Sequence, residues 1–403
     1  MDFELSSEQK AVRQLARDFA RKEILPVVPE IMAEGRFPRE LIRRLGEVGF
    51  LGATFPEKYG GSELGFVMLA LISEEIGKAM PVLGSAFNMN SMTVPFTILN
   101  WGTEEQIERY VPPLISGQKI GFFGLTEPDG GSDVVGAMKT RAVRDDSHYI
   151  LNGGKVFITF LCEADYGVVF AKTDPELKHR GISAFIVPTN LPGVTRQKMK
   201  LSALGSTMAT GELTLEDVRV PKENLLGEEG QGFTTAMNAL DYGRLTVPAR
   251  AVGLAQGCLE EALRYANERM AFGKRIGEFQ MVQHSLADMV VEVDAARLLV
   301  WRSAYLKDRD LPSTRESSIS KYYSSEVAMR AVRAAAEIFG GYAVSDEYPL
   351  SKYLNYTYLL LAGEGSPNIQ RVLIAEDALG WKNANRHAIP RRFSLRSDLQ
   401  ELA

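Results

Sequence analysis

The sequence predicts an α+β fold in three segments: an N-terminal helical domain at residues 1–120, a middle β-sheet domain at 121–230, and a C-terminal helical bundle with a tail at 231–403. Two kinds of observation lead to this prediction. A chain of 403 residues is longer than one hydrophobic core usually serves. Apolar residues recur at helical spacing near both ends of the chain, whereas in the middle they alternate with a period of two.

The first helix is predicted to begin after Ser6. Ser6 and Gln9 have the spacing of a capping box, in which each side chain bonds the backbone N–H of the other residue. Four apolar residues then fall on one helical face, which we expect to be buried: Val12, Leu15, Ala16 and Phe19.

The middle segment has the turn and strand signals of a β-sheet. Asn152-Gly153 is a favoured hairpin-turn dipeptide, so we expect residues 149–151 and 156–159 to form paired strands on either side of it. Residues 182–187 and 212–220 have the β-branched content or the alternation that is typical of strands.

The last segment returns to a helical period. Its apolar residues alternate at spacings of four and three, which is typical of a helix packed in a bundle or across a subunit interface. These residues are Val282, Leu286, Met289, Val293, Ala296 and Val300.

The composition is that of an ordinary globular protein. Charged residues make up 24% and the formal net charge is -5, so no basic surface indicates a nucleic-acid partner. The two cysteines, Cys162 and Cys258, lie far apart, and the four histidines are dispersed, so we expect neither a disulfide framework nor a metal site. No apolar run approaches the roughly 18 residues of a membrane span, and the N-terminus does not resemble a signal peptide. We therefore expect a cytoplasmic protein.

The common nucleotide-binding and zinc-protease motifs do not occur. The chain has no GxGxxG after a strand, no GxxxxGK[ST] and no HExxH. A nucleotide cofactor, if one binds, is not held in the Rossmann manner.

Five separated motifs occur in one order: FFGLTEPDGGSD at 122–133, KVFIT at 155–159, ERMAFGKRIGEFQ at 268–280, EIFGGYA at 337–343 and GEGSPNIQR at 363–371. Together they make the chain similar to the acyl-CoA dehydrogenase family over nearly its whole length. The resemblance implies three domains, noncovalent FAD, an acyl-CoA substrate, a homotetramer or homodimer, and electron delivery to electron-transferring flavoprotein.

The first two motifs correspond to a flavin-binding surface in the family. Glycines allow the backbone to approach a flat cofactor, and the hydroxyls of Thr126 and Ser132 can bond its polar edge or the CoA chain. Strand alternation would place Phe157 and Thr159 on one face, where an aromatic ring covers the isoalloxazine and a hydroxyl reaches N5. The family usually has Trp where this chain has Phe157. By the same resemblance Phe123, Leu125 and Gly131 contact FAD.

The third and fourth motifs resemble the segments that bind the cofactor phosphates in the family. A guanidinium such as that of Arg269 matches a pyrophosphate with a fork of donors. In the family this segment, which includes Phe272 and Gln280, binds the FAD of a neighbouring subunit. Gly340 and Gly341 fit a tight helix C-cap and in the family approach the same phosphates. At position 337 this chain has Glu where the family usually has Gln.

Glu364 is the predicted catalytic base. The α-proton of an acyl thioester is weakly acidic, so the enzyme needs a carboxylate of raised basicity and donors for the developing enolate. Apolar residues precede Glu364 and a glycine stands on each side, so we expect burial to raise its pKa and the backbone to take an unusual path. It matches the position of the family's catalytic glutamate.

The resemblance also carries over the residues around this base. Gly243 stands where a minority of the family places its base, so no rival carboxylate occupies that position. Asp241 and Arg244 match residues near the CoA pantetheine, and Ser366 and Asn368 match FAD contacts.

The substrate prediction depends on departures from the family pattern. Gly363 replaces a tyrosine before the base, which should enlarge the acyl pocket and favour a branched, cyclic or aromatic chain, such as cyclohexanecarboxyl-CoA or benzylsuccinyl-CoA. The overall pattern is closest to the glutaryl-CoA dehydrogenase-like branch. However, Gly84 aligns with the arginine that binds the distal carboxylate there, which speaks against glutaryl-CoA because a buried carboxylate without a cation is costly. Residues after His387 are expected to form a solvated tail.

Other functions stay open as alternatives. They are glutaryl-CoA dehydrogenase, an acyl-CoA oxidase that reoxidises FAD with oxygen, a flavin monooxygenase that lacks the base, and a noncatalytic acyl-CoA or flavin-binding protein. Retention of Glu364 argues against the last two.

Overall fold

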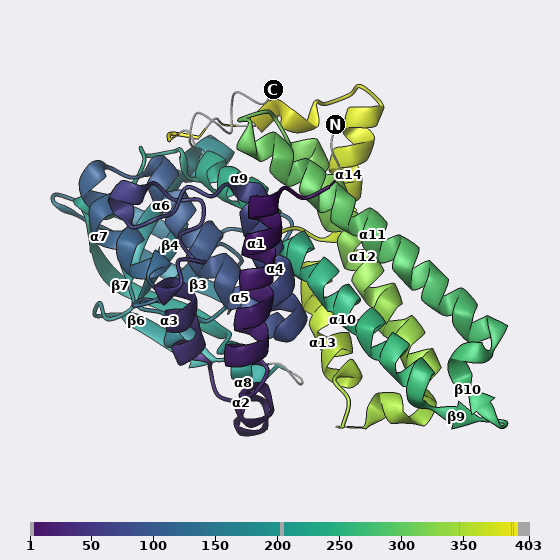
Figure 1. Cartoon of the computed structure of the whole chain (residues 1–403). Coiled ribbons are helices and arrows are strands. Elements are labelled where there is room, and N and C mark those ends of the chain that lie inside the picture. The colour runs from purple at the N-terminus through teal and green to yellow at the C-terminus, as the bar shows by residue number, and fades with distance from the viewer. Residues whose placement is uncertain (1–3, 202–204, 346, 388, 390, 394–403) are drawn as a thin grey trace. The chain divides into compact units, whose positions relative to one another are not determined.

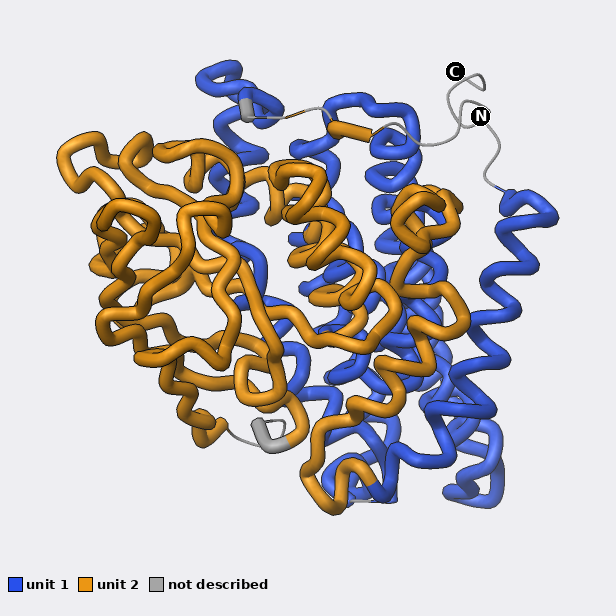
Figure 2. The backbone as a smooth tube through the Cα atoms, turned by 90° about the vertical axis from the view of Figure 1, so that its left-hand side faces the viewer, with its two compact units in different colours: residues 1–30, 66–85, 244–386 blue, residues 31–65, 86–243, 387–403 orange. Residues whose placement is uncertain are grey.

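The computed structural model of the chain describes residues 4–201, 205–345, 347–387, 389 and 391–393 (Figure 1). The chain forms two compact units, and each is built from segments far apart in the sequence (Figure 2). Unit 1 comprises residues 1–30, 66–85 and 244–386, and unit 2 comprises 31–65, 86–243 and 387–403. The expected α+β fold, with a β region between helical regions, is confirmed.

Unit 1 is a helical bundle. The long helix α10 packs against α4, α11 and α12, and α12 also contacts α13 and α14. The bounds are α1 Ser7–Phe19, α4 Phe66–Ala79, α10 Thr246–Glu268, α11 Gln280–Asp308, α12 Thr314–Phe339, α13 Leu350–Ala362 and α14 Pro367–Ala378, with a two-stranded hairpin of β9 Met270–Ala271 and β10 Lys274–Arg275. Two helices, α2 Val28–Glu34 and α5 Pro81–Asn88, cross from one unit to the other along the chain.

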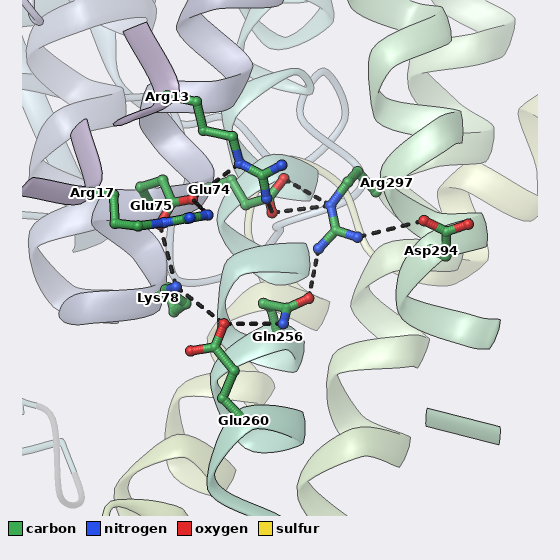
Figure 3. Close-up of polar contacts among 9 residues, drawn as sticks. All are labelled: Arg13, Arg17, Glu74, Glu75, Lys78, Gln256, Glu260, Asp294 and Arg297. Carbon is green, nitrogen blue, oxygen red and sulfur yellow. Dashed lines mark hydrogen bonds and ion pairs between the residues drawn. The ribbon is translucent and has the colours of Figure 1, made fainter. Parts of the chain in front are cut away.

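A network of charged and amide side chains ties four helices of this bundle together (Figure 3). Glu75 of α4 is 1% exposed and accepts hydrogen bonds from Arg13 and Arg17 of α1. Its neighbour Glu74 pairs with Arg297 of α11, whose Nη2 also donates to Gln256 of α10. A buried carboxylate that loses its partner is strongly destabilising. Moving one of these helices away from the others would break such pairs, so the contacts hold the helices together.

The expected helix start and buried faces are partly confirmed. Ser6 and Gln9 form the predicted capping box of α1, and Ala16 and Phe19 are buried. The prediction for Leu15 is wrong, because its side chain is 55% exposed. On α11 the late members of the predicted apolar seam are buried, namely Met289, Val293, Ala296 and Val300, while Val282 and Leu286 are half-buried. No helix of the described residues is long and apolar enough to cross a membrane.

Unit 2 is built around one mixed sheet. The described strands run in the order β6-β7-β3-β2-β4-β5-β8, and β1 pairs with β4 in parallel. The bounds are β1 Gly121–Gly124, β2 Arg141–Asp145, β3 His148–Ile158, β4 Tyr166–Lys172, β5 Ile182–Pro188, β6 Val194–Lys198, β7 Gly211–Pro221 and β8 Leu225–Leu226. Strands β5 and β7 confirm the two strands expected from alternation. The helices of this unit are α3 Arg39–Glu47, α6 Val94–Trp101, α7 Glu104–Ile115, α8 Gly205–Met208 and α9 Gly232–Gly243.

The predicted hairpin at Asn152-Gly153 is wrong. Strand β3 runs straight through these residues, and its antiparallel partner β2 meets it at Asp145 and His148. Gly153 lies at an irregularity of the β3–β7 register and has φ +145°, and a Cβ there would lie 2.6 Å from the Cα of Thr140. The glycine therefore serves a β-bulge, which has the same sequence signal as a turn.

The predicted solvated tail is wrong for the described residues that follow His387. The backbone N–H of Arg392 donates to Asn100 Oδ1 at 2.8 Å, and its guanidinium bonds the carbonyl of Gly102. The ring of Phe393 meets Tyr59 edge-on at 6.0 Å, so this part of the tail is packed on unit 2. The rest of the tail, including Arg396, for which the same solvated state was expected, lies outside the described residues.

Candidate functional site

Glu364 occupies a strained loop between two helices of unit 1. Helix α13 ends at Ala362, and α14 begins with Ser366 as its N-cap. Glu364 has φ +55° and Gly365 has φ +98°, so both lie in the left-handed region. Residues other than glycine rarely adopt that region, and such strain is typical of functional positions. The unusual backbone path that the flanking glycines predict is present, and the Glu364 side chain is half-buried.

Three side chains hold the backbone of this loop. Lys321 is fully buried on α12, and its Nζ donates to the carbonyls of Leu361 at 2.9 Å and Gly365 at 2.8 Å. Arg244 Nε donates to the carbonyl of Glu364 at 3.1 Å, and Gln370 of α14 donates to the same carbonyl at 3.4 Å. Since these donors come from separate segments of unit 1, the fold fixes the backbone from which the Glu364 side chain extends.

Burial lowers the pKa of Lys321 to about 7. The carboxylate of Glu364 opposes this shift, whereas the guanidinium groups of Arg244 and Arg250 add to it. A lysine with such a pKa is a mixture of charged and neutral forms near neutral pH, and both forms can donate hydrogen bonds to the two carbonyls.

Ser366 and Asn368 have local partners at the start of α14. The Ser366 side chain accepts from the N–H of Ile369 at 3.4 Å, and Asn368 Oδ1 accepts from Arg371 at 3.0 Å. Their predicted contact with FAD stays a prediction. Gly363, just before the base, has ordinary extended backbone, so its small size rather than its conformation distinguishes it from the family's tyrosine.

The third and fourth motifs line one cavity of unit 1. Its volume is ≈ 680 Å³, and its lining includes Arg269, Gly340 and Gly341 together with Glu337 and Tyr342. A Cβ added at either glycine would meet no atom within 4 Å, so the backbone lies open to a ligand. Gly340, with φ +58°, ends α12 as the predicted C-cap. Arg333 pairs with Glu337 at 3.1 Å and offsets part of its charge.

The hairpin after Arg269 projects apolar side chains into solvent. Phe272 lies at its tip with φ +50° and is 96% exposed, and Met270 and Met281 are also exposed. Gln280 is the first residue of α11 and is exposed. Large apolar side chains gathered in this way are characteristic of surfaces that another molecule covers.

A buried ion pair fixes the first motif to strand β3 in unit 2. Lys155 is fully buried and donates to Glu127 at 2.7 Å. Burial alone would raise the pKa of Glu127, but the charge and hydrogen bond of Lys155, with donors from Thr140 and Lys139, outweigh burial and lower it. The N–H of Val156 also donates to the carbonyl of Thr126 at 3.0 Å. The loop that carries Thr126 therefore lies beside the strand that carries Phe157.

The predicted common face of Phe157 and Thr159 is wrong as a strand feature. Phe157 has φ +56° and is 60% exposed, and Thr159 lies beyond the end of β3 and is half-buried. The positive φ breaks the pleat, so residues 156, 157 and 158 do not alternate regularly. An exposed aromatic ring remains available for stacking.

The other residues of this motif divide into packed and open positions. Leu125 is buried, and the Phe123 ring lies 5.0 Å from that of Phe170 in the sheet. Gly131 and Ser132 are exposed, and a Cβ at Gly131 would meet no atom within 4 Å. Asp241 lies on α9 of unit 2, and Arg244 begins the last segment of unit 1.

Comparison with known proteins identifies the family. The chain matches three family descriptions in order: the acyl-CoA dehydrogenase N-terminal domain at 6–118, the middle domain at 122–218 and the C-terminal domain at 230–379. The chain belongs to the acyl-CoA dehydrogenase family. It is therefore an FAD-dependent oxidoreductase.

Three acyl-CoA dehydrogenase relatives illustrate the range of the likeness. The chain is 41% identical to glutaryl-CoA dehydrogenase of Desulfococcus multivorans over 96% of this chain and 100% of that protein. It is 40% identical to the caffeyl-CoA reductase-Etf complex subunit CarC of Acetobacterium woodii over 92% of this chain and 98% of the other. It superposes with TM-score 0.88 on a glutaryl-CoA dehydrogenase from Mycobacterium smegmatis in complex with FADH2, at 31% identity over 93% and 95% of the two chains.

The acyl-CoA dehydrogenase cofactor suits the residues described above. The cavity of unit 1 offers the Arg269 guanidinium and an open glycine backbone, as an anionic pyrophosphate requires. Unit 2 offers the exposed Phe157 ring and the half-buried Thr126.

Four buried polar side chains near the site were not predicted from the sequence. Lys321 and Arg250 lie outside the five motifs, whereas Glu127 and Gln370 lie within the first and the last motif. Of the four, Lys321 could have been found from the sequence, because it is a charged residue on the buried face of α12, where lysine is rare unless it has a partner.

Proposed function

We propose that this acyl-CoA dehydrogenase forms the α,β double bond of an acyl-CoA thioester, with Glu364 abstracting the α-proton. The observation that carries the proposal is the Glu364 loop, where the carboxylate stands on left-handed backbone whose carbonyls accept hydrogen bonds from Arg244, Lys321 and Gln370. A structural glutamate in a surface turn needs neither the strain nor the buried donors.

The mechanism follows from what a carboxylate can do at that position. Glu364 accepts the proton from the α-carbon, and the electron pair of the broken C–H bond moves toward the thioester carbonyl. Bound FAD would supply the acceptor for the hydride that leaves the β-carbon. The hydrogen-bonded loop would contribute by fixing the backbone beneath the carboxylate before substrate arrives.

We propose FAD contacts for each unit by itself. In unit 1, Arg269, Gly340 and Gly341 would bind the pyrophosphate of the FAD of a neighbouring subunit, as the family resemblance implies. Ser366 and Asn368 of unit 1 would also contact FAD. In unit 2, Thr126, Ser132, Phe157 and Thr159 would contact the flavin ring, with Phe123, Leu125 and Gly131 around it.

We propose a homo-oligomer, a tetramer by family resemblance, in which Phe272 and Gln280 meet the FAD of another subunit. The 96% exposed ring of Phe272 supports a partner at this hairpin. An isolated chain would leave that ring in water.

The proposed substrate class is a branched, cyclic or aromatic acyl-CoA, with Asp241, Arg244 and Gly363 near it. Cyclohexanecarboxyl-CoA and benzylsuccinyl-CoA are examples, and glutaryl-CoA is the alternative. The name of the caffeyl-CoA reductase subunit supports an aryl-bearing chain, and that of the Desulfococcus relative supports glutaryl-CoA.

For the electron acceptor we propose electron-transferring flavoprotein, because the caffeyl-CoA relative is named as part of an Etf complex. We place the protein in the cytoplasm. The competing oxidase function predicts rapid hydrogen peroxide formation when substrate is added in air, and the proposed dehydrogenase function predicts little.

An anaerobic panel of CoA thioesters tests the proposal. The purified yellow protein is mixed with each thioester, and loss of flavin absorbance is followed. We expect bleaching with at least one branched, cyclic or aromatic thioester or with glutaryl-CoA. A protein that carries FAD, binds thioesters and bleaches with none of them would overturn the proposed function.

A further inference from the structure

We propose that Arg250 binds a carboxylate on the acyl group, so that the substrate is a short acyl-CoA carrying a second, free carboxylate. This inference rests on the proposed function, since it assigns the substrate class of the same site. It concerns residues of unit 1 alone.

Arg250 is a buried cation that no carboxylate of the described residues neutralises. Its side chain lies on α10, and the residue is 4% exposed. One terminal nitrogen donates to the carbonyl of Gly84 at 3.3 Å, and Nε has no acceptor among the described residues. Within the described part of the chain no carboxylate forms an ion pair with it. A buried guanidinium in this state costs several kcal/mol, and a ligand that supplies the anion would remove that cost.

Two glycines make room for this arginine. A Cβ at Gly77 of α4 would lie 2.6 Å from Arg250 Cβ and 2.8 Å from its Cα, so any larger residue would displace α10. A Cβ at Gly84 would lie 3.4 Å from Arg250 Cδ. The side chain therefore runs past glycine-lined backbone of α4 and α5, and the guanidinium lies beside Gly84.

The guanidinium also lies within electrostatic range of the residues around the base. Arg250 and Glu364 both act on the charge of Lys321, with opposite signs. Arg250 further opposes the burial that raises the pKa of Tyr356, whose hydroxyl bonds Ser85 Oγ at 2.6 Å. Around Lys321, the cations Arg244 and Arg250 are thus set against the carboxylates of Glu364 and Glu326. Counting Lys321 itself, the positive charges outnumber the negative ones, which favours an anionic acyl group.

A carboxylate is the ligand group that suits this site best. It accepts two parallel hydrogen bonds from a guanidinium, and the pair is charge-assisted. A neutral acyl group would leave Nε and the positive charge unmatched. The missing cation at position 84 therefore does not exclude a dicarboxylic substrate, because Arg250 supplies a cation to the same place from another helix. Of the candidate substrates, glutaryl-CoA and benzylsuccinyl-CoA carry the free carboxylate and cyclohexanecarboxyl-CoA does not.

Calorimetric titration of the FAD-loaded Glu364→Gln protein tests this inference without turnover. Glutaryl-CoA is compared with pentanoyl-CoA, and benzylsuccinyl-CoA with its methyl ester. We expect at least one carboxylate to bind about 30-fold or more tightly than its neutral match, as truncation of buried charge pairs indicates. Adding Arg250→Gln should bring that ratio close to 1, and Arg250→Lys should retain part of it because charge remains without the bidentate fork.

Arg297→Gln in the same background is the matched control. Arg297 also lies on a helix of unit 1, but it already has Glu74 and Gln256 as partners, so its loss should leave the ratio unchanged. Equal binding of charged and neutral thioesters, or a ratio that Arg250→Gln and Arg250→Lys both leave intact, would overturn the inference. A preference for the carboxylate that depends on Arg250, in a wild-type protein that never bleaches, would support this inference and reject the proposed function.

Discussion

Replacing Lys321 with methionine should change how the stability of the protein depends on pH. Lys321 is fully buried, and burial lowers the pKa of its ammonium group because it disfavours the charged form. Methionine has a similar length, so it fills the space without an ionisable group. The variant therefore isolates the contribution of one titrating side chain.

The magnitude follows from the lowered pKa. A fall from 10.5 to about 7 corresponds to about 5 kcal/mol of free energy lost by the charged form on folding. Below pH 7 Lys321 is protonated in both the folded and the unfolded protein, so folding bears the full free-energy cost of burying the charge. As the pH rises from 7 towards 10.5 the folded state binds fewer protons than the unfolded state, so stability rises. Between pH 6 and 9 the wild type should gain about 3 kcal/mol relative to Lys321→Met.

Urea unfolding of the two FAD-loaded proteins at pH 6, 7.5 and 9, followed by tryptophan fluorescence, measures this difference. Lys22→Met serves as the control, because Lys22 is exposed and its removal should give a difference that does not vary with pH. The reasoning is refuted if the difference between wild type and Lys321→Met stays constant over this range. Activity of the variant should also fall, since the carbonyls of Leu361 and Gly365 lose their donor and the base loop loosens.

Two further changes test other parts of the structure. Arg269→Ala should lower both the FAD retained per chain and the oligomer stability on gel filtration, because the cavity loses its guanidinium. The control Arg275→Ala, in the hairpin that follows Arg269, should lower neither. Unchanged FAD content in Arg269→Ala would contradict the assignment. Glu75→Gln should lower the free energy of unfolding by about 3 kcal/mol at pH 7, because it breaks a buried charge network, and the exposed-pair control Arg21→Gln should cost less than about 1 kcal/mol. Since the pKa of Glu75 is lowered from 4.5 despite its burial, this difference should shrink as the pH falls below 4.5, and a difference that persists in acid would contradict the pairing.

The sequence predicted what depends on local chemistry. The capping box at Ser6, the C-cap at Gly340 and the left-handed loop around Glu364 follow from residues adjacent in the chain. The apolar seam of α11 follows from a period that persists over several turns. The structure places the motifs containing Arg269 and Gly340 at one cavity, and their contact with the FAD phosphates stays a prediction.

What the sequence missed depends on partners that are distant in the chain. Asn152-Gly153 has the same composition in a bulge as in a hairpin turn, and only the course of β2 and β7 beside it decides between them. Leu15 has the right spacing for a buried face, but the described residues leave its side chain 55% exposed. The position of Arg250 beside Gly84 depends on how α10 packs against α4 and α5, which no local pattern encodes.

The most direct test of the proposed base is anaerobic flavin bleaching by the Glu364→Gln variant with a thioester that the wild type oxidises. The amide preserves the shape of the side chain and the loop that Arg244, Lys321 and Gln370 hold, so FAD content and thioester binding should be retained. The bleaching rate should fall by about 10⁴-fold or more, at or beyond the upper end of general-base contributions, because the α-proton is weakly acidic. A variant that bleaches at a rate near that of the wild type would show that Glu364 is not the base.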